Sequence, residues 1–329
     1  MKAAIIGIAG PELNAAEIAL IRQHRPAGVI LFGRNVVDPQ QLAALTGHLA
    51  RVLPPLAVIM VDQEGGRVAR MRPPHWLGHP AAGVLGALQA INRPAGLRAA
   101  WLTGALIGME AAAAGFDVVC APVLDLAVPG ASNVVGDRSY SSDPAIVGEM
   151  AATVAAGMLA AGVQPVGKHC PGHGRATVDS HAGLPLLPDI DEADLVPFAR
   201  CAHLPWMMTA HIVYEAADPS HPATQSPTII AEVIRDRLGY GGLLVSDDLA
   251  MGALTGSPAE RAIGALAAGC DLALHCSGVL EDSAGVLEAC AEPTEAALGR
   301  MRTALFLADR SRQALDPSAM LAERDALLA

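Results

Sequence analysis

The segment from Val166 to Leu187 concentrates more ionisable side chains than any other stretch of the 329-residue chain. It reads VGKHCPGHGRATVDSHAGLPLL, and its basic and acidic groups include Lys168, His169, His173, Asp179 and His181. Glycines and prolines interrupt it, so we predict an irregular loop that follows a buried strand rather than a helix. Because loops on a rigid scaffold commonly carry catalytic groups, we expect the chemistry of the protein here.

The single lysine of this segment is unusual for the chain. Lysine occurs only at positions 2 and 168, whereas arginine supplies every other basic side chain except histidine. A chain that otherwise uses arginine retains a compact ammonium group at position 168. This choice indicates a site in which a planar guanidinium would not serve.

The elements that must position these groups alternate along the chain. Short apolar runs of strand type are followed by longer helical stretches rich in Ala and Leu. We place the strands at 3–8, 28–32, 57–61, 116–120, 163–167, 206–210, 242–245 and 271–275, and the helices near 12–24, 39–53, 95–114, 144–162, 192–202, 227–238, 257–269, 278–291 and 293–309. Continuous apolar strands separated by helices predict a parallel sheet, and eight of them predict an α/β fold closed into a (β/α)8 TIM barrel.

An open, doubly wound sheet is the alternative architecture. It is disfavoured because the first strand, with IGIAGP at its end, lacks the GxGxxG spacing of a dinucleotide site. We expect one catalytic domain over residues 1–329, with residues 310–329 as a peripheral C-terminal tail.

Polar residues recur where the predicted strands stop, which is where barrel active sites form. They are Asp62, Glu64, Arg67 and Arg70 after the third strand, Asp125 and Arg138 after the fourth, Lys168 and His169 after the fifth, His211 after the sixth, and Asp247 and Asp248 after the seventh. Any one of them could be a helix cap or a turn residue. So many at one end of one barrel indicate a functional site.

Composition limits the partners. A net charge of −11 argues against nucleic acid or an acidic membrane surface, both of which require basic patches. The six cysteines form no CxxC pair, and the apolar N-terminal run ends early at Gly10-Pro11, unlike a signal peptide. No apolar run approaches the roughly 18 residues that would span a bilayer. We therefore expect a cytoplasmic protein, and a monomer, that acts on a small molecule.

Seven short motifs resemble the single-domain bacterial β-N-acetylglucosaminidases of glycoside hydrolase family 3. They are VDQEGGRVAR (61–70), APVLD (121–125), GDRSY (136–140), GKHCPGHG (167–174), DSHAGLP (179–185), MTAH (208–211) and VSDDLAM (245–251). The resemblance implies that Asp247 is the nucleophile and that His181, partnered by Asp179, is the acid/base. It implies a sugar-binding set formed by Asp62, Arg70, Arg138, Lys168 and His169. Cys170 stands where Phe is commoner and Gln63 where His is common, neither at a catalytic position.

The chemistry of these residue types agrees with those roles. Asp179 and His181 are two residues apart, so an extended backbone would direct both side chains to one face. An aspartate bonded to one ring nitrogen orients the imidazole and stabilises its protonated form, which lets the other nitrogen donate a proton. Asp247 at a strand end can supply the carboxylate that attacks a sugar with retention. The alternative interpretation is that Asp179 caps a turn and His181 is a surface residue without a catalytic role.

The remaining charges suit a sugar. A carboxylate such as Asp62 can accept hydrogen bonds from two adjacent hydroxyls while Arg70, Arg138 and Lys168 donate, and a wrong sugar would leave buried groups unpaired. A purely structural Asp62–Arg70 ion pair is the alternative.

We expect no metal and no cofactor. The histidines at 169, 173 and 211 invite comparison with metal sites of amidohydrolase-like barrels, but those sites need an HxH pair after the first strand, where this chain has IAGPE. We expect His173 to be a loop residue bonded to backbone and His211 to line the pocket floor.

The leading hypothesis is a retaining exo-β-N-acetylglucosaminidase that, by resemblance, removes terminal N-acetylglucosamine from N-acetylglucosaminyl-anhydro-muropeptides during peptidoglycan recycling. A β-N-acetylglucosaminide phosphorylase is the nearest alternative, because a neutral histidine tolerates an incoming phosphate better than a carboxylate base does. A catalytically inactive sugar-binding barrel is a third, which the intact Asp179, His181 and Asp247 disfavour.

Overall fold

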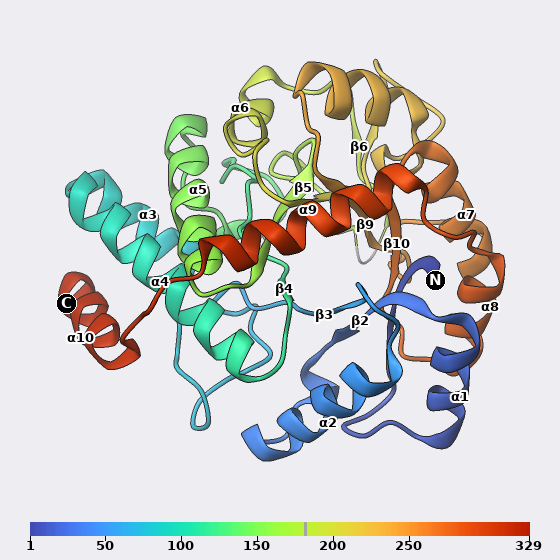
Figure 1. Ribbon diagram of the computed structural model, residues 1–329. Helices are drawn as coiled ribbons and strands as arrows, with labels where there is room; N and C mark the ends of the chain where they lie inside the picture. The colour runs from blue at the N-terminus through green and yellow to red at the C-terminus, as the bar shows by residue number, and fades with distance from the viewer. Residues whose placement is uncertain (181–182) are drawn as a thin grey trace.

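Eight parallel strands close into a barrel in the computed structural model, which describes residues 1–180 and 183–329. The order around the barrel is β1-β10-β9-β7-β5-β4-β3-β2 (Figure 1). The strands are β1 (Lys2–Gly7), β2 (Pro26–Leu31), β3 (Val58–Val61), β4 (Val118–Val119), β5 (Gln164–Cys170), β7 (Trp206–Thr209), β9 (Leu243–Asp248) and β10 (Leu272–His275). All eight predicted strands and the barrel class are confirmed.

Helices follow the strands and cover the outside of the barrel. They are α1 (Ala15–His24), α2 (Pro39–Val52), α4 (Arg93–Ala113), α5 (Pro144–Ala160), α6 (Glu192–Arg200), α7 (Pro258–Ala268), α8 (Leu280–Ala289) and α9 (Glu295–Ser311), with a π-helix, η4 (Ile229–Arg237), after β7. Polar side chains start most of them. Asn14 and Ser257 form capping boxes with Glu17 and Glu260, which satisfies amide groups that the first helical turn leaves unpaired.

Some elements were not predicted. Helix α3 (Ala82–Ile91) lies between β3 and α4, and a two-stranded sheet, β6 (Leu186–Leu187) with β8 (Val213–Tyr214), lies outside the barrel. Residues 310–316 end α9 and lead to α10 (Pro317–Leu328), which packs on α4. Arg324 of α10 is buried and contacts the Nδ1 atom of His79 at 3.1 Å.

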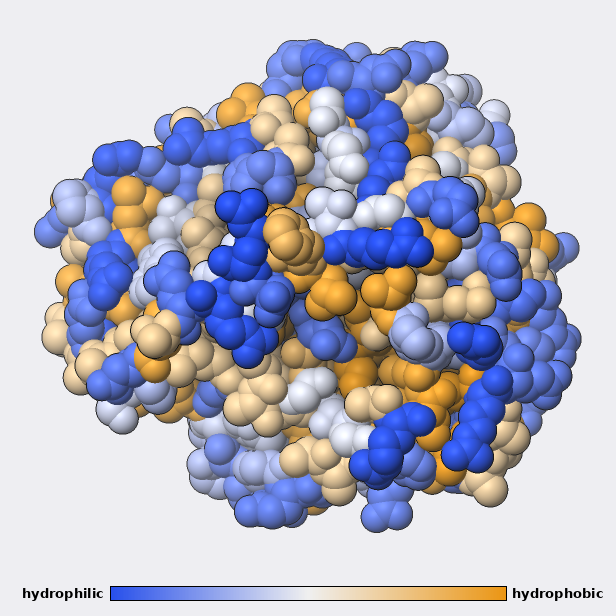
Figure 2. Space-filling model, viewed as in Figure 1, coloured by the Kyte–Doolittle hydropathy of each residue, from blue (hydrophilic) through white to orange (hydrophobic). Residues whose placement is uncertain are grey.

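The two ends of the barrel differ. Helix α9 crosses the end at which the strands begin, and its Met301 and Ala304 pack against the barrel interior (Figure 1). The same face in space-filling view shows apolar and charged residues intermixed (Figure 2). The carboxyl end of the strands therefore remains for a site. Within the described residues, no helix is both long and apolar enough to cross a membrane.

Candidate active site

A pocket lies at the carboxyl end of the barrel, and the empty space in it, counted together with the solvent at its mouth, is about 780 Å³. Six residues that the sequence predicted for the site line this one pocket: Asp62, Arg70, Arg138, Lys168, His169 and Asp247. Apolar side chains complete the lining, among them Phe32 and Met251. The structure thus brings together groups that lie up to 185 positions apart, from Asp62 to Asp247.

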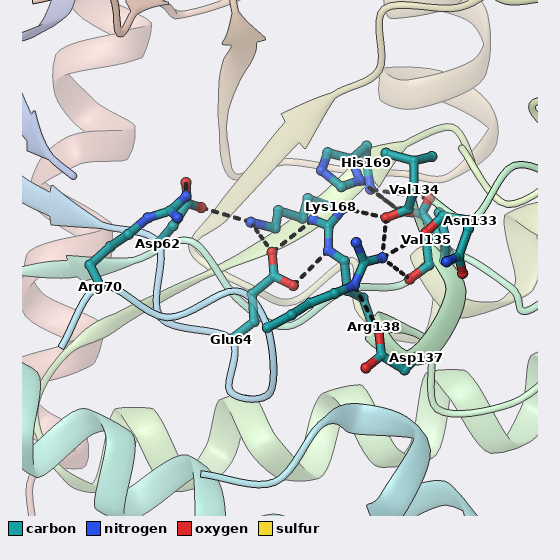
Figure 3. Close-up of polar contacts among 12 residues, drawn as sticks. Asp62, Glu64, Arg70, Asn133, Val134, Val135, Asp137, Arg138, Lys168 and His169 are labelled. Atoms are coloured by element: carbon teal, nitrogen blue, oxygen red, sulfur yellow. Dashed lines mark hydrogen bonds and ion pairs between the residues drawn. The ribbon is translucent and has the colours of Figure 1, made fainter. Parts of the chain in front are cut away.

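Lys168 is the centre of a buried ion-pair cluster on one wall of the pocket. Its Nζ lies 2.9 Å from Oδ1 of Asp62 and 2.7 Å from Oε1 of Glu64. Arg70 pairs with Asp62 at 3.1 Å, and Arg138 donates two hydrogen bonds of 2.8 Å to Glu64 (Figure 3). The expected Asp62–Arg70 pair is therefore one edge of a cluster of five residues, and each of the five also lines the pocket.

The charges in this cluster hold one another in their ionised forms. Burial alone would raise the pKa of Asp62, but Lys168 and Arg70 outweigh it, and the pKa lies well below its ordinary value. Burial would likewise lower the pKa of Lys168, whereas Asp62 and Glu64 raise it above its ordinary value. The Lys168 side chain is only 3% exposed, so a larger guanidinium has little space there. This explains the lysine in an arginine-rich chain.

His169 is oriented by Asp125 beneath the pocket. The Nδ1 atom of His169 lies 2.7 Å from Oδ2 of Asp125, and Asp125 also accepts the backbone N–H of His173 at 2.7 Å. Burial opposes ionisation of Asp125, but His169 and His173 lower its pKa, so Asp125 is an acceptor. The His169 ring then donates through Nδ1, and Nε2 is the nitrogen that remains for a ligand.

Asp247 projects from the end of β9 into the same pocket. Its Oδ1 accepts the backbone N–H of Asp248 at 2.8 Å. Burial would raise the pKa of Asp247, but His169, His211, the Asp248 N–H and Lys168 together lower it. Asp247 is therefore a carboxylate at neutral pH, as a nucleophile requires.

Asp248 and His211 hold the backbone beside Asp247. The Oδ1 atom of Asp248 accepts the N–H groups of Ala250 and Cys276 at 2.8 and 2.9 Å, and the Nε2 atom of His211 donates to the Asp248 carbonyl at 2.9 Å. The other ring nitrogen of His211 contacts the Thr224 hydroxyl at 2.8 Å. His211 is fully buried beneath the strand end, whereas the sequence analysis placed it on the pocket floor.

The predicted acid/base pair lies only partly within the described residues. His181 is outside them, so its partnership with Asp179 remains a prediction. Asp179 is half-buried, and the next residue, Ser180, is buried and lines the pocket. His173, expected to be a loop residue bonded to backbone, donates its own N–H to Asp125, while its ring is buried and bonds the hydroxyl of Ser180.

The sequence placed Glu64 and Asp125 among the polar residues at strand ends but predicted neither Glu64 in the sugar-binding set nor Asp125 as the partner of His169, and it gave no role to Ser180. A usable signal existed for Glu64. It stands two positions after Asp62, and this spacing directs both side chains to one side of an extended chain. No comparable spacing connects Asp125 with His169 or Ser180 with His173.

A closed parallel barrel with an ionised carboxylate and a buried polar cluster in one pocket at the carboxyl end of its strands has the architecture of the TIM-barrel enzymes. The family model for the glycosyl hydrolase family 3 N terminal domain matches residues 3–301. The chain therefore belongs to glycosyl hydrolase family 3.

Comparison with individual proteins shows which members of this family the chain resembles. The beta-hexosaminidase of Alkalilimnicola ehrlichii is 46% identical over 282 residues, covering 83% of this chain and 80% of that protein. The beta-hexosaminidase of Methylococcus capsulatus is 38% identical and covers 97% of this chain and 94% of that protein. The crystal structure of NagZ from Neisseria gonorrhoeae in complex with N-trifluoroacetyl-D-glucosamine matches with a TM-score of 0.88 at 30% identity. The match covers 100% of this chain and 98% of that chain. The protein is thus a glycoside hydrolase of the β-hexosaminidase group, which confirms the predicted enzyme class.

Proposed function

We propose that the protein is a retaining exo-β-N-acetylglucosaminidase that releases terminal, non-reducing N-acetylglucosamine from muropeptides derived from peptidoglycan. The observation that carries the proposal is Asp247, an ionised carboxylate in a pocket that the ion-pair cluster also lines. A pocket with a buried polar wall suits the end of a glycan rather than its middle.

In the proposed first step, a carboxylate oxygen of Asp247 bonds to the anomeric carbon as the bond to the leaving oxygen breaks. That oxygen takes a proton from His181, which Asp179 supports. In the second step His181 removes a proton from water, the water oxygen bonds to the anomeric carbon, and Asp247 is released. Two inversions give retention of configuration.

The cluster supports sugar recognition in this scheme. Carboxylates that are already held by Lys168 and Arg70 can accept hydrogen bonds from sugar hydroxyls without first being ordered. A sugar lacking the matching hydroxyl would leave these buried groups unpaired, which discriminates strongly. His169 adds a donor or acceptor through Nε2.

The biological setting that we propose, peptidoglycan recycling, rests on the resemblance of the seven sequence motifs to the bacterial β-N-acetylglucosaminidases of family 3. On that basis the substrate is an N-acetylglucosaminyl-anhydro-muropeptide, and the enzyme acts in the cytoplasm as a monomer that needs neither nucleic acid nor a membrane.

Hydrolysis of 4-nitrophenyl N-acetyl-β-glucosaminide beside the plain β-glucoside tests the sugar specificity, and we expect the acetamido sugar to be preferred at least about 100-fold. Product analysis in phosphate buffer tests the reaction type. Free N-acetylglucosamine is the expected product, and the 1-phosphate would identify a phosphorylase instead. Equal rates on the two aryl glycosides would exclude the proposed specificity.

A further inference from the structure

Ser180 is a buried residue within the loop segment that carries the predicted acid/base pair. Thr177 and Val178 are exposed, and Asp179 is half-buried. Ser180 is 2% exposed, and it is the one described residue between Ala176 and Pro185 that is buried. A serine hydroxyl placed there requires a partner, because an unpaired buried hydroxyl costs about 1–3 kcal/mol.

His173 supplies that partner. Its Nε2 lies 2.9 Å from the Ser180 hydroxyl, and the residue as a whole is 3% exposed. Among the described residues the ring has no other hydrogen-bond partner, since the buried Nδ1 atom has none. Burial and the nearby His169 lower the pKa of His173, so the ring is neutral and offers one donor and one acceptor.

The same contact connects Ser180 to the rest of the site. The His173 ring packs edge-on against His169, with 5.8 Å between ring centroids, and the His173 backbone is bonded to Asp125. On its other side, the Ser180 carbonyl accepts the N–H of Ala253 at 3.1 Å, in the loop that follows β9 and Asp247. Ser180 is thus tied both to the sugar-binding histidine and to the nucleophile's own loop.

We propose that His173 and Ser180 are positioning residues for proton transfer: their hydrogen bond fixes Ser180, which stands in the sequence between the predicted pair Asp179 and His181, relative to Asp247. The inference rests on the proposed function, because it matters only if these neighbours form the acid/base pair. In this reading neither His173 nor Ser180 exchanges a proton with the substrate.

Leaving-group dependence tests the inference. Protonation of the leaving oxygen matters for a poor leaving group such as the sugar of N,N′-diacetylchitobiose, and little for 4-nitrophenolate. We expect Ser180→Ala and His173→Ala to lower kcat/KM, which reports the leaving-group step and not the later attack of water, roughly 10- to 100-fold on the disaccharide, since small misplacements of catalytic groups cost about that much. On the aryl glycoside we expect losses below about threefold. His173→Gln, whose amide nitrogen can replace Nε2, should restore most of the rate.

Thr177→Ala is the matched control, since it changes an exposed residue of the same segment. It should behave like the wild type on both substrates. Equal losses on both substrates in Ser180→Ala, or no loss, would overturn the inference. So would His173→Ala if it slowed the disaccharide as much as His181→Ala does, because His173 would then be the proton donor itself.

His181→Ala separates this inference from the proposed function. A selective loss on the disaccharide in His181→Ala, without one in Ser180→Ala, would reject the positioning role and leave the proposed mechanism in place. A loss in His181→Ala that is equal for the two substrates would reject the acid/base assignment, and the positioning role with it.

Discussion

The two halves of the pocket are built in different ways. Asp62, Lys168 and Asp247 stand at or directly after the ends of barrel strands β3, β5 and β9 and are fixed by ion pairs or backbone N–H groups. The predicted acid/base pair instead stands on the loop between β5 and β6, whose His173 and Ser180 line the pocket. In the proposed mechanism, the groups that stabilise charge are therefore held by the barrel itself, whereas the groups that transfer the proton stand on one loop.

This difference suits the two tasks. A developing oxocarbenium ion is stabilised best by groups that need no rearrangement, and strand ends provide them. A proton donor must accept leaving groups of different size, and a loop can be varied without disturbing the barrel. We therefore expect mutations on the two sides to differ in kind: those in the strand-held half affect all substrates and stability, and those in the loop-held half affect substrates selectively.

The largest effect is expected in the strand-held half. Asp247→Asn should lower kcat by at least about 1,000-fold on aryl and sugar leaving groups alike, because the amide cannot form the glycosyl-enzyme. A 2-fluoro sugar should label Asp247 in the wild type, as seen by mass spectrometry of peptides. Asp248→Asn is the control: its remaining carbonyl oxygen can still accept the two N–H groups, so the loss should stay below about tenfold. Labelling of Asp248 would contradict the assignment.

The second effect tests whether the cluster also carries stability. Lys168→Met removes the ammonium between Asp62 and Glu64, and loss of one partner from buried ion pairs costs about 3–5 kcal/mol. The remaining Arg70 and Arg138 should keep the cost near the lower figure, measured by urea unfolding. Lys2→Met, which changes the other lysine, should cost about 1 kcal/mol or less. Similar losses in both variants would show that the cluster has no special role in stability.

The prediction of the fold from sequence succeeded where a physical pattern was complete. Most strands are continuous apolar runs, because both of their faces are buried, and polar residues gather toward the ends of β5 and β9. Helix α3 was missed: AGVLGALQAI follows a stretch rich in Pro, Gly and His that reads as loop, and its start at Ala82 lacks a side-chain cap. Its place is set by packing on α4.

For the site, the sequence predicted most of the residues that line the pocket but not the residues that orient them. Ionisable groups at strand ends were recognisable, and six of the eight predicted site residues line one pocket. The partners that orient them were not. Asp125 lies 44 positions from His169, and an aspartate after a strand is equally typical of a turn. Which histidine of the segment would be buried against Ser180 depends on how the loop folds back, and no spacing in the sequence encodes that.

A smaller effect concerns Asp194 of α6. Its Oδ2 atom lies 2.7 Å from Nε of Arg175, which belongs to the loop between β5 and β6. Burial raises the pKa of Asp194 from 3.8 to about 6, although Arg175 opposes this. A raised folded pKa means that this group adds stability that is complete below about pH 3.8 and lost as the pH rises through about 6. In the wild type, ionisation of Asp194 therefore lowers the melting temperature between pH 5 and pH 8. Asp194→Asn removes this contribution, so its melting temperature should fall by a few degrees less than that of the wild type between these pH values.

Asp191→Asn is the matched control for this prediction, because Asp191 also pairs with Arg175, at 2.9 Å, but is more exposed. It should retain the wild-type difference between the two pH values. A change in the opposite direction in Asp194→Asn would show that the ion pair with Arg175, and not burial, dominates this carboxyl group.

The smallest expected effect is none. We expect that neither half of the pocket needs a bound metal ion. Dialysis against a strong chelator should therefore leave the rate on the aryl glycoside unchanged. The described residues contain no group of three or more side chains able to hold a metal ion. Activity lost on dialysis and restored by zinc would contradict the prediction and make the histidines of the pocket metal ligands.

The six cysteines give the barrel a set of natural reporters. All are free and buried, at positions 120, 170, 201, 270, 276 and 290. Burial raises the pKa of each thiol, to about 12 for Cys201 and Cys270 and about 11 for Cys290. Thiol reagents attack the thiolate, so the native protein should resist them at neutral pH.

Each cysteine becomes reactive only when its own surroundings open. Cys170 ends β5 where the loop between β5 and β6 begins, and Cys276 directly follows β10, on the other side of β9 from β5. The rates at which a thiol reagent modifies the two, followed by mass spectrometry of peptides, compare local opening at the loop with opening of the barrel rim. The unmodified sequence thus carries the probes needed to measure which part of the site loosens first.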